Sequence, residues 1–219
     1  MLRASLTDLY LRYVKHGLRP FLIAAGVLLV VSAAATFWYE MRGHRHDDGH
    51  GHAHGGPKVA WLLMLPVLGL LLVAPPALGS YAANRAGTAL TRTDGDFVPL
   101  PAGDPARITV LDYASRAVYD QGRSMSGRRI QISGFLIAAP RGGWYLTRMI
   151  LTCCAADARP IKVALTGQVP DGLKADGWLQ VVGRYSDKVD KDPVNGETIP
   201  YLDVDEARTL TAPAEQYEG

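Results

Sequence analysis

Pro20–Tyr39 reads PFLIAAGVLLVVSAAATFWY and carries no charged residue in twenty positions. A second uncharged stretch, Val59–Ser80, reads VAWLLMLPVLGLLLVAPPALGS. A bilayer core about 30 Å thick needs roughly 20 apolar residues of helix to cross it. Trp38, Tyr39 and Trp61 stand at the ends of these stretches, as is typical of membrane–water interfaces. The two stretches therefore predict a membrane α-helical hairpin, with transmembrane helices at 20–39 and 59–80.

The first stretch has an alternative interpretation. Ala33–Ala35 follows a basic start and resembles the cleavage site of a signal peptide. The length of the stretch and the aromatic pair after the alanines favour an uncleaved anchor. Two spans place both termini on one side of the membrane, and the side with more Lys and Arg is the cytoplasmic one. The six flanking basic residues are Arg3, Arg12, Lys15, Arg19, Arg85 and Arg92, against Arg42, Arg45 and Lys58 in the loop. We therefore expect cytoplasmic termini and an extracytoplasmic loop.

The loop between the spans, 40–58, contains five of the six histidines of the chain. They are His44, His46, His50, His52 and His54. Imidazole is the commonest metal-binding side chain, and a flexible run can gather several imidazoles around one ion. Because the spacing defines no single geometry, zinc, nickel, copper and cobalt all fit it. The alternative is a passive linker, since Gly- and His-rich runs also occur as spacers without a metal role.

The rest of the chain divides into four parts. Residues 1–19 form an amphipathic segment before the first span, 81–106 a linker, 107–212 a soluble domain and 213–219 a tail. Within the domain, 108–120 begins like a strand and continues as a helix with Leu111, Ala114 and Val118 on one face. Five strand candidates separated by Gly, Pro and Asp turns follow at 128–138, 143–151, 160–165, 178–185 and 201–210. With Gly134 and Gly183 as bends, they predict a C-terminal mainly-β, OB-like small barrel.

The only two cysteines, Cys153 and Cys154, are adjacent and follow a strand candidate. With Asp157 they offer two thiolates and a carboxylate to zinc, copper or another transition metal. In an extended segment the two side chains point to opposite faces, so binding one ion requires a bend. A disulfide between neighbours would be strained and easily reduced. The alternative is that both thiols are inert and fill the interior of the domain.

Composition argues against two classes of function. From residue 101 onward the chain has 14 Lys and Arg against 15 Asp and Glu, whereas nucleic-acid-binding domains usually carry excess positive charge. Histidine is absent after His54, so the domain has no histidine base for hydrolytic catalysis. No phosphate-binding loop, dinucleotide fingerprint or zinc-peptidase motif occurs. We expect a protein that is not an enzyme and has no nucleic-acid partner.

Three segments resemble the bacterial YcgQ-type membrane protein family over nearly the whole chain. They are YLRYVKHGLRP at Tyr10–Pro20, CCAADARPI at Cys153–Ile161 and GWLQVVG at Gly177–Gly183. The resemblance implies two N-terminal spans, a His-rich loop, a soluble C-terminal domain and association with a multi-span permease in the bacterial cell membrane. It implies no known activity.

From these observations and the resemblance we expect an accessory subunit of a membrane permease, linked to transition-metal binding or transport. Its apolar spans would contact membrane lipid. Two spans enclose no polar pathway, so we expect a permease partner or a homo-oligomer. The main alternative is a membrane-anchored module that binds a protein or another ligand and has no metal role. A haem chaperone on an anchored barrel is a third hypothesis, weakened because the domain lacks histidine.

Overall fold

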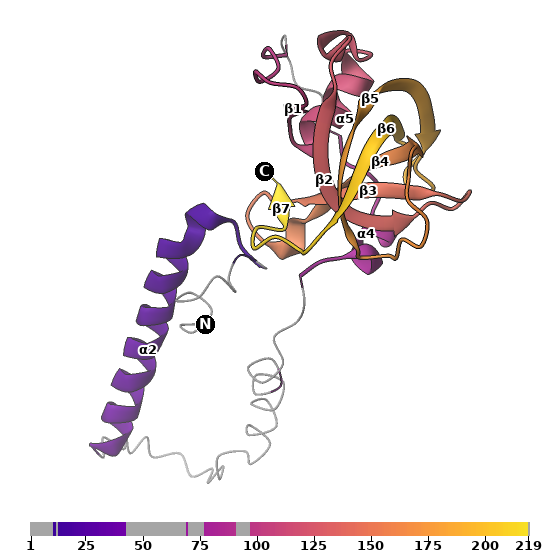
Figure 1. Cartoon of the computed structure of the whole chain (residues 1–219). Coiled ribbons are helices and arrows are strands. Elements are labelled where there is room, and N and C mark those ends of the chain that lie inside the picture. Colours follow the sequence, from indigo (N-terminus) through magenta and orange to yellow (C-terminus); the bar gives the residue numbers. More distant parts are fainter. Residues whose placement is uncertain (1–10, 12, 43–68, 70–76, 91–96, 219) are drawn as a thin grey trace. The chain divides into compact units, whose positions relative to one another are not determined.

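The computed structural model describes residues 11, 13–42, 69, 77–90 and 97–218. The chain divides into two compact units, whose elements are drawn in sequence colours in Figure 1. One unit comprises Met1–Thr7 with Gly17–Ala77, and the other comprises Asp8–His16 with Leu78–Gly219. The short segment before the first apolar stretch therefore belongs to the same unit as the C-terminal domain.

The first apolar stretch forms α2 (Arg19–Met41), preceded by the 3-10 turn η2 (His16–Leu18). Pro20 is tolerated in the first turn, where a backbone N–H has no partner within the helix. The 23 residues of α2 span about 35 Å, which is enough to cross a bilayer core. Most of its apolar side chains are exposed. The helix is long and apolar enough to cross a membrane, and a signal sequence near the N-terminus would share these properties.

The predicted second span, 59–80, lies outside the described residues except for Gly69 and positions 77–80. Its last residue, Ser80, begins the short helix α4 (Ser80–Arg85). The carboxylate of Asp176 accepts hydrogen bonds from the backbone N–H and the hydroxyl of Ser80, at 2.6 and 2.7 Å. These bonds hold the start of α4 against the domain.

The segment predicted as a linker, 81–106, contacts the domain over its described residues. Ala83 of α4 and Thr88 are fully buried, and the N–H of Ala89 donates to the carbonyl of Pro160 at 3.0 Å. We call Ala86–Leu90 the strap, because it runs in extended form across the domain after α4. At the other end of the chain, the predicted tail contributes a strand, β7 (Tyr217–Glu218), which pairs with the domain.

The domain is mainly β. Its remaining elements are β1 (Ala106–Arg107), α5 (Val110–Tyr119), η4 (Arg123–Met125), β2 (Ile130–Ala138), β3 (Trp144–Ile150), η5 (Ala155–Asp157), β4 (Arg159–Gly167), β5 (Trp178–Lys191) and β6 (Thr198–Leu210). All five strands predicted from alternation and turn residues are present as β2 to β6. β5 continues to Lys191, beyond its predicted end at 185, β6 begins at Thr198 in place of 201, and the two strands pair as a long hairpin.

The five long strands pair in a closed circuit (Figure 1). β2 pairs with β3 and β5, β3 with β4, and β5 with β6, all antiparallel. β4 and β6 close the circuit in parallel. Both predicted bends lie where two backbones approach closely: a Cβ at Gly134 would meet the carbonyl of Thr147, and one at Gly183 that of Asp203. A register shift between Val182 and Gly183 marks the second bend.

The hydrophobic core combines one face of the sheet with α5. Thr109 caps the helix by accepting a hydrogen bond from the N–H of Asp112 at 3.0 Å. The fully buried face of α5 is formed by Val110, Tyr113 and Ala114, at helical spacing. The sequence placed Leu111, Ala114 and Val118 on that face. Only Ala114 is buried, because the helix packs on β4 and β6 with a face rotated from the predicted one.

Candidate metal centre

The two cysteines lie in the loop 151–158 between β3 and β4. Cys154 is extended, with φ −150° and ψ 171°, and the 3-10 turn η5 begins immediately after it. This turn reverses the chain and brings Asp157 back beside the residues that precede it. Two adjacent cysteines in an extended segment need a bend to bind one ion. A bend is present here, although it follows Cys154 and does not lie between the two cysteines.

The ligand atoms of Cys153, Cys154 and Asp157 all lie within 4.8 Å of one another. Cys153 is exposed, and Cys154 and Asp157 are half-buried. Both cysteines are free thiols. Among the residues that the structure describes, no other cluster of three or more Cys, His, Asp or Glu side chains has this proximity. The arrangement offers a metal two sulfur ligands and one oxygen, with solvent access to the remaining coordination position.

Asp157 organises the loop through backbone hydrogen bonds. Its carboxylate accepts from the N–H of Thr152 at 3.0 Å and from the N–H of Cys153 at 2.8 Å. It also accepts a hydrogen bond from the thiol of Cys153, which is the largest cause of the lowered pKa of the Asp157 carboxyl. The same hydrogen bond, with a second one to Cys154, raises the pKa of the Cys153 thiol to about 11. Without a metal, Cys153 is therefore a protonated donor and Asp157 an ionised acceptor.

The segment before the first apolar stretch pairs with this loop. Val14 forms an isolated antiparallel bridge with Cys154. The N–H of Lys15 donates to the carbonyl of Cys153 at 3.2 Å, and the N–H of Ala155 donates to the carbonyl of Tyr13 at 2.7 Å. The backbone of the two cysteines is thus held by a segment far away in sequence, a feature that sequence reasoning missed.

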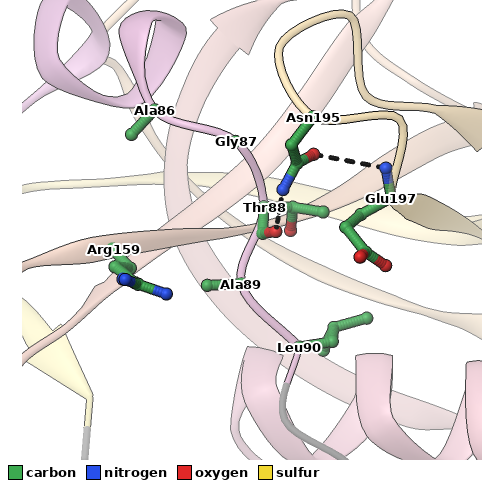
Figure 2. Close-up of a pocket in the computed structure, with 8 residues that line it drawn as sticks. All are labelled: Ala86, Gly87, Thr88, Ala89, Leu90, Arg159, Asn195 and Glu197. Carbon is green, nitrogen blue, oxygen red and sulfur yellow. Dashed lines mark hydrogen bonds between the residues drawn. The ribbon is translucent and has the colours of Figure 1, made fainter.

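Two cavities lie next to each other on this side of the domain. One, of ≈ 440 Å³, is lined by residues of α5, β3 and β4 and includes Asp157. The other, of ≈ 410 Å³, is shown in Figure 2 and is lined by the strap, by Arg159 at the start of β4 and by the turn that joins β5 to β6. Ala89 and Arg159 line both cavities, so the two meet at these residues.

A buried ion pair fastens the strap to the domain. The ammonium of Lys162 donates to the carboxylate of Asp192 at 2.8 Å and to the carbonyl of Ala86 at 2.9 Å. The same carboxylate oxygen accepts from the N–H of Thr88 at 2.7 Å. The side chains of Lys162 and Asp192 are 2% and 0% exposed. Sequence reasoning missed this pair, although a lysine inside the apolar strand PIKVAL was a signal for it.

The sequence-predicted metal ligands thus have two different outcomes. The structure brings together Cys153, Cys154 and Asp157, which the sequence proposed as one group. The five predicted histidine ligands of the loop lie outside the described residues: His44, His46, His50, His52 and His54. The histidine site stays a prediction.

Comparison with known proteins matches the domain to one family model. The model is described as DUF1980 C-terminal domain, and it matches residues 108–218, which is just over half of the chain. No curated protein and no solved structure matches the chain. The matched residues run from just before α5 to the end of β7 and include the cysteine loop. The chain belongs to the DUF1980 C-terminal domain family, which occurs commonly in bacterial membrane-associated proteins.

Proposed function

We propose that this protein is a membrane-anchored metal-binding protein that serves a permease. In this proposal Cys153, Cys154 and Asp157 bind a transition metal, with zinc as the leading candidate. The observation that carries the proposal is the convergence of the three ligand atoms within 4.8 Å. Tetrahedral zinc with sulfur at about 2.3 Å and oxygen at about 2.0–2.2 Å keeps its ligand atoms roughly 3.5–3.8 Å apart. A short closing movement of the three side chains is sufficient to bind one ion.

The chemistry of the three ligands favours exchange over permanent binding. Structural zinc sites are closed by four protein ligands, whereas this site supplies three and leaves a position open to solvent. Because Cys153 is exposed, a donor or acceptor molecule can reach the ion. An exposed, incomplete site suits a protein that passes metal to or from a partner.

A cobalt titration of the full-length chain in detergent tests this function. Cobalt(II) replaces zinc and gives a sulfur-to-metal absorption band only when thiolates bind it. We expect this band in the wild type and in a variant with all five loop histidines changed to alanine. We expect its loss in the Cys153→Ser/Cys154→Ser variant and no change in Asp171→Asn, an exposed carboxyl in another loop. If the band is absent from the wild type, or survives in the double serine variant, the proposal is wrong.

The pairing of residues 13–15 with the cysteine loop supports the predicted topology. This segment precedes α2 by a few residues, and it belongs to the same unit as the domain that follows residue 78. Both ends of the intervening chain then lie on one side of a membrane. If α2 crosses the bilayer, the chain must cross back before residue 78, and the apolar stretch that begins at Val59 is able to do so. A cleaved signal peptide would remove residues 13–15, so the pairing favours an uncleaved anchor.

We infer from this topology that the histidine loop and the cysteine site face opposite sides of the membrane. The loop then collects metal outside the cytoplasm of a bacterial cell, the cysteine site handles it inside, and the two cannot share one ion. Two spans provide no polar pathway of their own, so a multi-span permease is the proposed partner. This arrangement matches what the YcgQ-type resemblance implies.

We further infer that the domain is an OB-like barrel. The closed circuit of β2, β3, β4, β6 and β5, with its single parallel pair β4–β6, supports this assignment. Five-stranded barrels of this kind bind ligands across the face of their second and third strands and with nearby loops. In this chain those strands are β3 and β4, and the cysteine loop connects them.

A further inference from the structure

The cavity in Figure 2 has a rigid wall. The strap forms one side, and its backbone position is set by the Lys162–Asp192 ion pair and by the bond from Thr88 to Asp192. Asn195, on the opposite turn, donates its side-chain amide to the carbonyl of Thr88 at 2.9 Å. Because these contacts are made within the protein, the cavity is formed before any ligand enters.

Two groups of opposite charge line this cavity. Arg159 is the first residue of β4, and Glu197 lies in the turn between β5 and β6. Among the residues that the structure describes, neither side chain has a hydrogen-bond or ion-pair partner. Figure 2 shows them on opposite sides of the strap, with the guanidinium directed toward it. The side-chain amide of Asn195 already makes hydrogen bonds within the protein, whereas Arg159 and Glu197 are both exposed and their charged groups are available to a ligand.

We propose that this cavity binds a small zwitterion, an amino acid or short peptide, with its carboxylate on Arg159 and its ammonium on Glu197. A guanidinium presents paired donors that match a carboxylate, and a carboxylate accepts from an ammonium. The lining carries one positive and one negative side chain, so a ligand with a carboxylate and an ammonium provides a partner for each of them.

The size and surface of the cavity agree with this ligand class. Its volume of ≈ 410 Å³ lies at the lower end of ligand pockets, which range over about 300–1,000 Å³. The strap contributes small residues, Ala86, Gly87 and Ala89, and one larger apolar side chain, Leu90. None of the three metal ligands lines this cavity, so the proposal goes beyond the proposed function and does not depend on it.

Calorimetric titration of the full-length chain with alanine and alanine peptides of increasing length, the alanine ladder, tests the site. The probes are L-alanine, di-alanine and tri-alanine, together with N-acetyl-alanine, which lacks the ammonium, and alaninamide, which lacks the carboxylate. We expect saturable binding of at least one zwitterion and a loss of about ten- to a hundredfold in affinity for each blocked form. The rank order within the ladder distinguishes a free amino acid from a peptide.

Variants assign each charge to its partner. In Arg159→Gln, alaninamide and L-alanine should bind equally weakly, because the carboxylate has lost its partner. In Glu197→Gln, N-acetyl-alanine and L-alanine should bind equally weakly, because the ammonium has lost its partner. Lys174→Gln, which removes an exposed charge from another loop, should leave binding unchanged. Circular dichroism and urea unfolding report whether each variant is folded.

The proposal is overturned if the folded wild type shows no saturable binding of any zwitterion in the ladder. It is equally overturned if blocked and unblocked ligands bind alike, or if Lys174→Gln weakens binding as much as Arg159→Gln. Failure of the cobalt band with intact zwitterion binding would instead count against the metal site alone.

Discussion

Asp157 determines the chemistry of the cysteine loop through three hydrogen bonds. Two come from backbone N–H groups and hold the loop in its turn, and the third comes from the thiol of Cys153. The third bond keeps a proton on sulfur, so a metal that binds here must displace it. Binding should therefore release protons and strengthen as the pH rises toward the raised pKa of Cys153, about 11.

Asp157→Asn should make Cys153 more reactive. Removing the carboxylate removes the main cause of the raised pKa, so the pKa falls toward its ordinary value of 9.0 and more thiolate is present at pH 8. We expect alkylation by iodoacetamide to accelerate by about tenfold or more, because the thiolate is the nucleophile. The rate is measured by mass spectrometry in a Cys154→Ser background. Asp171→Asn is the control, and an unchanged or slower rate in Asp157→Asn would contradict the assignment.

Lys162→Met should destabilise the domain strongly. It leaves the carboxylate of Asp192 buried without its cation, a loss that typically costs about 3–5 kcal/mol. The exposed pair Arg184–Asp205 provides the comparison, and Arg184→Met should cost about 1 kcal/mol or less. Urea unfolding of the full-length chain, followed by tryptophan fluorescence, measures both. Equal effects of the two substitutions would show that the buried pair does not fasten the strap.

At the scale of the elements, residues 13–15 and the strap flank the apolar stretches of the sequence on either side, and both are bonded to the domain. Residues 13–15 pair with the cysteine loop, and the strap pairs with β4 through Ala89 and Pro160. Both are short extended pieces held by backbone hydrogen bonds, and both border the side of the domain with the cysteines and the two cavities. The cysteine loop is therefore in direct backbone contact with the residues that precede α2 in the sequence.

Lys15→Pro should loosen the cysteine loop. Proline lacks the N–H that donates to the carbonyl of Cys153, whereas Lys15→Ala keeps it. We expect faster hydrogen–deuterium exchange at Ala155, whose N–H donates to Tyr13, in the proline variant only. If both variants exchange like the wild type, residues 13–15 do not hold the loop.

For the whole molecule, the pairing of residues 13–15 with the domain predicts that the two candidate metal sites lie on opposite sides of the membrane, and the distribution of Lys and Arg predicts that the cysteine site is cytoplasmic. A membrane-impermeant maleimide applied to intact cells should label a cysteine placed at Gly51 and leave Cys153 and Cys154 unlabelled. Permeabilised, denatured cells provide the control in which all three thiols react. Labelling of the native cysteines in intact cells would reverse the topology, and failure to label Gly51→Cys would place the loop inside.

The sequence alone determined the elements whose signals are local. An uncharged run of helical length predicts α2, and alternation between Gly and Pro turns predicts all five long strands, because both patterns depend only on near neighbours. Cys153, Cys154 and Asp157 were identifiable as one group since they lie within five positions.

Only the tertiary structure decided what depends on contacts between distant residues. These include the closed circuit of strands, the burial of Lys162 against Asp192, the pairing of Val14 with Cys154 and the meeting of Arg159 and Glu197 at one cavity. Each requires a chain reversal whose geometry is set by the packing of the whole domain. Local periodicity carries no information about such contacts, so the sequence located the metal ligands but not the segments that hold them.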